Sequence, residues 1–166
     1  MSGAARKTYF PKTRLQQLLL RPGGISRDQA IQGANANIRA HGADSAAEVA
    51  NAIAAIAAIA ARSSNGRMSS AEMEKILEQG DHIVSLAGTF GYDHLERAAR
   101  ALCDITYGLV RTGCGDAAPI HVHVMALQVF SPTAPTPSDA EADKVLSELK
   151  AVMTFYQFGP IGSLAN

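Results

Sequence analysis

The sequence predicts an all-α fold, a helical bundle, on three observations. Its apolar residues are mainly alanine, leucine, isoleucine and valine, with 5% aromatic residues and no tryptophan, a composition that suits packed helices. Four serines each stand three residues before a glutamate or glutamine at the head of an apolar segment, the spacing of a helix capping box. Within those segments the apolar residues recur every three or four positions. The 166 residues are enough for one domain with a real core.

Residues 1–25 are predicted to form a basic, flexible tail. The tail has no acidic residue, and its proline and glycine residues, ending at Gly23-Gly24, disfavour a long helix. Its basic residues are Arg6, Lys7, Lys12, Arg14 and Arg21. Because 15 basic and 15 acidic residues balance over the whole chain, the rest is net acidic, and we predict no nucleic-acid partner.

Residues 26–62 are predicted to form an alanine-rich helical hairpin. Capping boxes beginning at Ser26 and Ser45 place its helices at 27–41 and 46–62. The second helix has four β-branched residues on an alanine background and almost no charge. This pattern fits either a core helix that covers the bundle or a surface that pairs two chains as a homodimer. In the second case Ile56→Glu would weaken self-association.

Residues 69–158 are predicted to form the main helical bundle. Its helices are expected at 70–87, 93–112, 117–130 and 138–156, with a proline-rich linker at 131–137. A short turn with two glycines, Gly88 to Gly91, makes the first two antiparallel neighbours. The alternation in Ile120–Val124 imitates a strand, but no second alternating segment could pair with it, so we interpret 117–130 as a helix.

Familiar catalytic and metal-binding patterns do not occur in the sequence. His121 and His123 would lie on different sides of a helix, with no cysteine or carboxylate cluster beside them, so we predict no metal site. Cys103 and Cys114 fit neither a disulfide framework nor a CxxC motif and are expected to be reduced. The sequence has no phosphate-cradling glycine loop and no hydrolase motif. We therefore expect neither a cofactor nor a conventional metabolic enzyme.

The stretch Asp81–Gly91 resembles the central motif of histidine-containing phosphotransfer (HPt) domains. Phe90-Gly91 matches the end of that family's turn. In the resulting register Asp81 occupies the phosphoacceptor position, Val84 the lysine position and Ser85 the glycine position. The resemblance covers roughly residues 69–130 and implies an HPt-like up-down core within the bundle.

Two departures from the motif shape the functional prediction. Asp81 is not a nucleophilic imidazole, and Val84 supplies no cation to offset phosphate charge. The resemblance therefore implies a non-enzymatic relative that binds a response-regulator receiver domain without accepting phosphate. The expected partner-binding residues are Gln79, Asp81, His82 and Ser85.

Three alternatives remain open from the sequence. A live phosphotransferase would use His82 as a displaced phosphoacceptor. Phosphatase chemistry would use an acid and an amide among Glu78, Gln79 and Asp81 to orient water. An architectural homo-oligomerisation module needs only the alanine-rich helices and no site.

Two further features bear on the cellular setting. The segments Pro11-Lys12-Thr13 and Gly23-Gly24-Ile25 are loosely similar to small accessory chemotaxis proteins of the CheE type, which also implies two-component or chemotaxis signalling. The first 25 residues have no continuous apolar region typical of a secretory signal, and the apolar run Ala50–Ala61, interrupted by Asn51, is shorter than a bilayer span. We therefore predict a cytoplasmic protein with no membrane partner.

Overall fold

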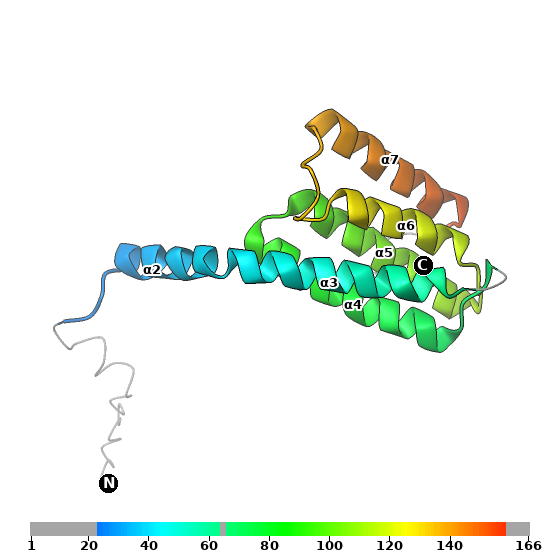
Figure 1. Ribbon diagram of the computed structural model, residues 1–166, viewed down its shortest axis with the longest axis horizontal. Coiled ribbons are helices and arrows are strands. Elements are labelled where there is room, and N and C mark those ends of the chain that lie inside the picture. The colour runs from blue at the N-terminus through cyan, green and yellow to red at the C-terminus, as the bar shows by residue number, and fades with distance from the viewer. Residues whose placement is uncertain (1–22, 64–65, 159–166) are drawn as a thin grey trace, which may run out of the picture. The chain divides into compact units, whose positions relative to one another are not determined.

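The computed structural model describes residues 23–63 and 66–158 and confirms the all-α prediction. The segment predicted as a helix at 117–130 forms a helix over Ala118–Val129 and no strand, and most of the predicted tail, residues 1–22, lies outside the described residues. Figure 1 shows the helices in chain order. They are α2 (Arg27–Ala40), α3 (Gly42–Ala61), α4 (Ser70–Phe90), α5 (Asp93–Thr112), α6 (Ala118–Val129) and α7 (Asp139–Phe155).

The chain divides into two compact units, residues 1–37 and residues 38–166, which are described separately. The division falls inside α2 rather than after residue 62, where we expected it, so α3 belongs to the same unit as α4 to α7. Helix α2 begins at the predicted capping box, in which Ser26 and Gln29 exchange hydrogen bonds of 3.0 and 3.2 Å. The pairing of 27–41 with 46–62 as a hairpin stays a prediction.

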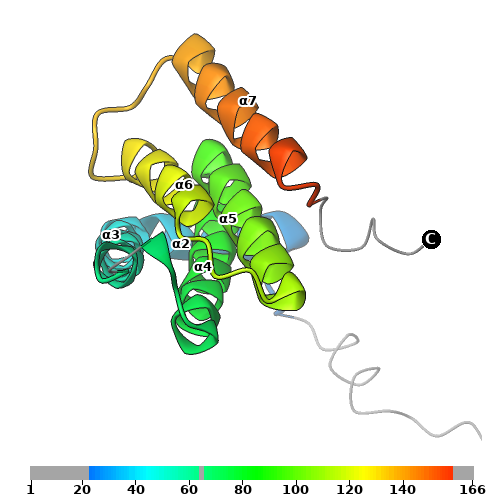
Figure 2. The same ribbon diagram turned by 90° about the vertical axis from the view of Figure 1, so that its right-hand side faces the viewer.

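Helices α3, α4, α5 and α6 form an up-down bundle. Each packs against the next, and α6 returns to α3, while α7 lies outside this ring against α5 and α6 (Figure 2). Short connections make consecutive helices antiparallel. Every one of the five helices contributes to a single hydrophobic core, which includes Ile56, Ile76, Leu102, Leu127 and Leu149.

Helix α4 is longer than the sequence predicted. It begins at the predicted capping box of Ser69 and Glu72, but it continues through Gly88-Thr89-Phe90, which we had expected to be part of the turn. Gly91 ends the helix with φ 77°, a left-handed conformation that glycine adopts without steric cost. The turn before α5 is therefore Gly91-Tyr92 alone, and α4 and α5 pack along nearly their whole length.

Helix α3 also begins earlier than predicted, because Ser45 is not its cap. The helix starts at Gly42, and the Ser45 amide already makes a helical hydrogen bond of 3.0 Å to the carbonyl of His41. The Ser45 side chain is buried, and its hydroxyl has no hydrogen-bond partner. The helix thus begins three residues before the position that its capping signal indicated.

The early start makes α3 20 residues long, and by length and composition alone it could cross a bilayer. We had expected the shorter run Ala50–Ala61 to exclude this. Length and composition are weak evidence, since the core helix of a soluble bundle passes the same test. In this bundle, Val49 and Ile56 of α3 are fully buried and belong to the common core.

Two connections meet at one end of the bundle. The Met68 amide donates to the Gly115 carbonyl at 2.8 Å, and the Ala117 amide donates to the Gly66 carbonyl at 3.0 Å. Together they form an isolated β-bridge that links the α3–α4 connection to the α5–α6 connection. The ends of four helices are tied together there, which holds α4 firmly against its neighbours.

Candidate functional site on the outer face of α4

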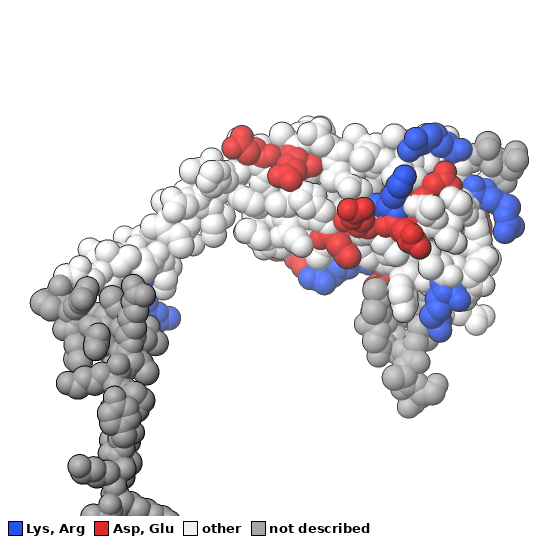
Figure 3. All heavy atoms as spheres, turned by 90° about the horizontal axis from the view of Figure 1, so that it is seen from below, with Lys and Arg blue, Asp and Glu red and all other residues white. Residues whose placement is uncertain are grey.

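The four residues predicted to bind a partner all lie on α4, the helix lowest in Figure 1. Asp81, His82 and Ser85 are exposed and Gln79 is half-buried. We call Gln79, Asp81, His82 and Ser85 the α4 face. Figure 3 views the bundle from this side and shows acidic side chains gathered over its middle. Helix α4 itself carries four carboxylates and one lysine, so a partner meets a net negative surface.

His82 and Gln79 lie on the side of α4 that faces α3. With Glu48, Asn51 and Glu78 they line an open groove of about 520 Å³ between the two helices. His82 Nε2 is 2.9 Å from Glu48 Oε1, and the two side chains are 42% and 57% exposed. Because a carboxylate oxygen accepts, Nε2 carries the proton in this contact. Glu48 therefore fixes the orientation of the imidazole.

Asp81 lies on the other side of α4, towards α5. The Cys103 thiol of α5 donates to Asp81 Oδ1 at 3.7 Å. Burial, and next the charge of Asp81, raises the pKa of Cys103 to about 12. A Cβ atom on neighbouring Gly80 would be 2.7 Å from Cys103 Sγ, so the helices approach closely beneath Asp81. The thiol is consequently a packing group and a poor nucleophile.

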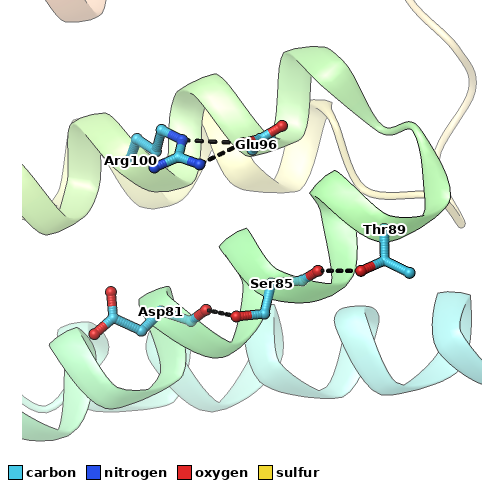
Figure 4. A network of polar contacts seen from close by, with 5 residues as sticks. All are labelled: Asp81, Ser85, Thr89, Glu96 and Arg100. Carbon is cyan, nitrogen blue, oxygen red and sulfur yellow. Dashed lines mark hydrogen bonds and ion pairs between the residues drawn. The ribbon is translucent and has the colours of Figure 1, made fainter. Parts of the chain in front are cut away.

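Ser85 belongs to a line of side chains that return to their own helix (Figure 4). Ser85 Oγ donates to the Asp81 carbonyl at 3.0 Å, and Thr89 Oγ1 donates to the Ser85 carbonyl at 2.8 Å. Both hydroxyl protons are therefore engaged by the backbone of α4. The oxygens keep lone pairs that face solvent, so this line presents mainly acceptors to a partner.

The cation drawn opposite this line comes from α5, and we had not predicted it as a site residue. Arg100 lies across from the Asp81–Thr89 line in Figure 4. Glu96 Oε1 accepts from its Nη2 and Nε atoms, at 2.6 and 3.0 Å. The i, i+4 spacing of Glu96 and Arg100 signals this pair in the sequence. The helix that Glu96 and Arg100 face depends on how α4 and α5 pack together. The residue pattern within one helix does not determine this packing.

The four residues of the α4 face thus do not converge on one site. Gln79 and His82 line the α3 groove, Asp81 contacts Cys103 of α5, and Ser85 donates to the backbone of its own helix. Gln79 and Asp81 do not converge on one water molecule, whereas Glu78 and Gln79 line the same groove, so the phosphatase alternative remains a prediction for that acid and amide alone. Within residues 23–63 and 66–158, no group of three or more histidine, cysteine or acidic side chains has the arrangement of a metal site.

Comparisons with known proteins identify no family for this chain. No family model matches it, and no curated protein or solved structure does.

Proposed function

We propose that this chain is a non-enzymatic signalling protein of a bacterial two-component or chemotaxis system, which binds a receiver domain through the α4 face. The observation that carries the proposal is the exposure of Asp81, His82 and Ser85 on a helix held between α3 and α5. A helix face already ordered in the free protein binds without the entropic cost of folding a loop. The resemblance of Asp81–Gly91 to the HPt motif supplies the class of partner. The proposal implies a cytoplasmic location.

The chemistry of the α4 face favours binding over phosphate transfer. At the phosphoacceptor position Asp81 is a carboxylate, and the hydroxyl of Ser85 donates to the backbone. Transfer also needs a cation that offsets the charge of the phosphoryl oxygens. Val84 at the expected position is half-buried and apolar, and Arg100 already pairs with Glu96. At Asp81 and Ser85 a docked receiver would meet acceptors and negative charge but no group ready to take its phosphoryl group.

A second candidate function, phosphotransfer through His82, has one observation in its favour. Because the Glu48 carboxylate holds the Nε2 proton, His82 Nδ1 keeps a free lone pair. Nδ1 would attack the phosphorus of an aspartyl phosphate, forming an N–P bond while the P–O bond breaks and its electrons leave with the aspartate carboxylate. The same groove contains the carboxylates of Glu48 and Glu78, which repel phosphoryl oxygens. We therefore place this candidate second.

Titration calorimetry against a panel of receiver domains from the same cell tests the proposal, with and without phosphorylation by acetyl phosphate. We expect saturable binding to at least one receiver, weakened about tenfold by Asp81→Lys, since reversing a charge at a docked face costs about 1.4 kcal/mol or more. Glu148→Lys makes the same charge change at an exposed position of α7 and should leave the affinity unchanged. Circular dichroism checks that both variants fold.

Incubation with radiolabelled phosphorylated receivers separates the two candidates. If label appears on this chain and is absent from the His82→Ala variant, the function is phosphotransfer and not binding alone. No affinity for any receiver of the panel, or equal effects of Asp81→Lys and Glu148→Lys, would overturn the proposed docking through α4.

A further inference from the structure

A second groove lies between α5 and α7, and none of its lining residues belongs to α4. It has a volume of about 460 Å³. Its lining combines apolar side chains with cations from both helices, Arg97 and Arg100 of α5 and Lys150 of α7. Neither the HPt resemblance nor the proposed receiver binding uses this groove.

The floor of the groove consists of apolar side chains that pack on the hydrophobic core and are partly exposed to solvent. Ala101, Leu146 and Met153 are half-buried and pack against core residues, yet they also line the groove. The small side chain of Ala101 leaves room between α5 and α7 that a larger residue would fill. From Leu146 to Met153 the groove follows about two turns of α7, roughly 10 Å. That length suits a short peptide segment.

The end of the groove is anchored by the residues that follow α7. The Phe158 ring lies directly over Gly108, where a Cβ atom would come within 2.5 Å of it. The Tyr156 hydroxyl donates a hydrogen bond to the Asp116 carboxylate in the α5–α6 connection. These contacts hold the C-terminal end of α7 against the bundle, so the groove keeps its shape without a ligand.

The charges of the groove indicate what it accepts. Arg97 and Lys150 are exposed, and neither forms an ion pair with another residue of the described part of the chain. Arg100 is held by Glu96, and Asp104 brings one carboxylate to the lining. The lining is net positive although the α4 face is net negative. An uncharged apolar ligand would leave the positive charges of Arg97 and Lys150 without a counter-charge. A simple anion would leave the apolar side chains of the floor in contact with water.

We propose that the groove between α5 and α7 binds an acidic amphipathic segment of a partner protein. Apolar side chains of the segment cover Ala101, Leu146 and Met153, and its carboxylates pair with Arg97 and Lys150. Helix-in-groove recognition commonly combines an apolar stripe with flanking charges of this kind. The partner engages a different face from the receiver, so the two can bind together.

Fluorescence anisotropy with the full chain tests this inference. The probe is a labelled amphipathic peptide of leucine, alanine and glutamate, and its counterpart carries lysine in place of glutamate. We expect the glutamate peptide to bind and the lysine peptide not to bind. The double variant Arg97→Glu/Lys150→Glu should weaken binding at least about tenfold, and added salt should weaken it in the wild type.

The chain offers a closely matched control. Arg111→Glu/Lys144→Glu makes the same charge change on the same two helices at exposed positions outside the groove lining, and should keep the wild-type affinity. Ala101→Leu keeps every cation but fills the floor, and should also weaken binding about tenfold. Thermal unfolding verifies that each variant is folded.

Three outcomes would overturn the inference. One is equal binding of the glutamate and lysine peptides, and another is an equal loss in the groove and control double variants. The third is no binding of the glutamate peptide while vesicles of anionic lipid bind through Arg97 and Lys150, since the groove would then recognise a membrane surface. Receiver binding through α4 is measured separately with Asp81→Lys, so the two proposals can fail independently.

Discussion

At the scale of single residues, the two histidines of α6 have opposite environments. His123 is fully buried, donates from Nδ1 to the Pro119 carbonyl at 2.7 Å, and has no partner for Nε2. Burial lowers its pKa from the ordinary value of 6.5, because the core does not solvate an imidazolium. His121 is exposed and shares a 3.2 Å hydrogen bond with Ser63. The sequence placed them on different sides of the helix, and the structure confirms it.

The buried histidine predicts a loss of stability in mild acid. A group whose pKa is lower in the folded state binds more protons when unfolded. The free energy of unfolding is therefore greatest above about pH 6.5 and decreases as the pH is lowered from there. His123→Leu removes this titration and should flatten the curve. Urea denaturation at about pH 7.5 and about pH 5.5 measures the difference. His121→Gln should keep the wild-type pH dependence, and an equally flat curve in that variant would contradict the assignment to His123.

The α4 face shows which residue properties the sequence could predict. Exposure of His82 follows from the period of apolar residues on α4, and the structure agrees. The contacts of His82 with Glu48 and of Asp81 with Cys103 could not be predicted. They depend on the rotation and register of three helices relative to one another, which periodicity within one helix leaves undetermined.

At the scale of elements, three of the four predicted capping boxes mark the start of a helix. The boxes at Ser26, Ser69 and Ser138 cap helices as predicted. The box at Ser45 fails, since the helix already begins at Gly42 and the Ser45 side chain is buried within its first turns. Similarly, α4 extends through Gly88, a residue that tolerates the helix even though it signalled a turn.

Serine-to-alanine substitutions should distinguish the true caps from the false one. Ser69→Ala removes a hydroxyl that accepts from the Glu72 amide at 3.3 Å, and should lower the free energy of unfolding by about 1 kcal/mol. Ser45→Ala removes a buried hydroxyl without a partner, and should be neutral or stabilising. Urea denaturation at neutral pH compares the two variants. A loss at Ser45 as large as that at Ser69 would show that Ser45 caps α3 after all.

At the scale of the whole molecule, pairing of two chains through residues 46–62 remains a prediction. Ile56 is a poor probe of it, because its side chain is fully buried in the core and Ile56→Glu would unfold the bundle. The exposed side of the C-terminal half of α3 includes small residues, among them Ala54 and Ala58. Close helix contact between two copies would use these alanines.

Ala58→Glu tests this pairing without disturbing the core. If two chains pair through α3, sedimentation equilibrium should show a dimer in the wild type and a monomer in the variant, because burying a glutamate without a partner opposes association. Ala151→Glu on the exposed side of α7 is the matched control and should remain dimeric. A monomeric wild type, or a dimer that Ala58→Glu leaves intact, would exclude α3 as the contact.

The two-residue turn between α4 and α5 has a consequence for how the chain reaches its native state. Because Gly91-Tyr92 is so short, these helices meet across a small closed loop and lose little chain entropy in doing so. Helix α7 follows the linker after Phe130 and is the last helix in chain order. It lies outside the ring of α3, α4, α5 and α6. We expect the α4–α5 pair to act as the folding nucleus and α7 to dock late. A chain of this protein that is still being synthesised would then expose Ala101, the part of the groove floor on α5, until α7 packs against it.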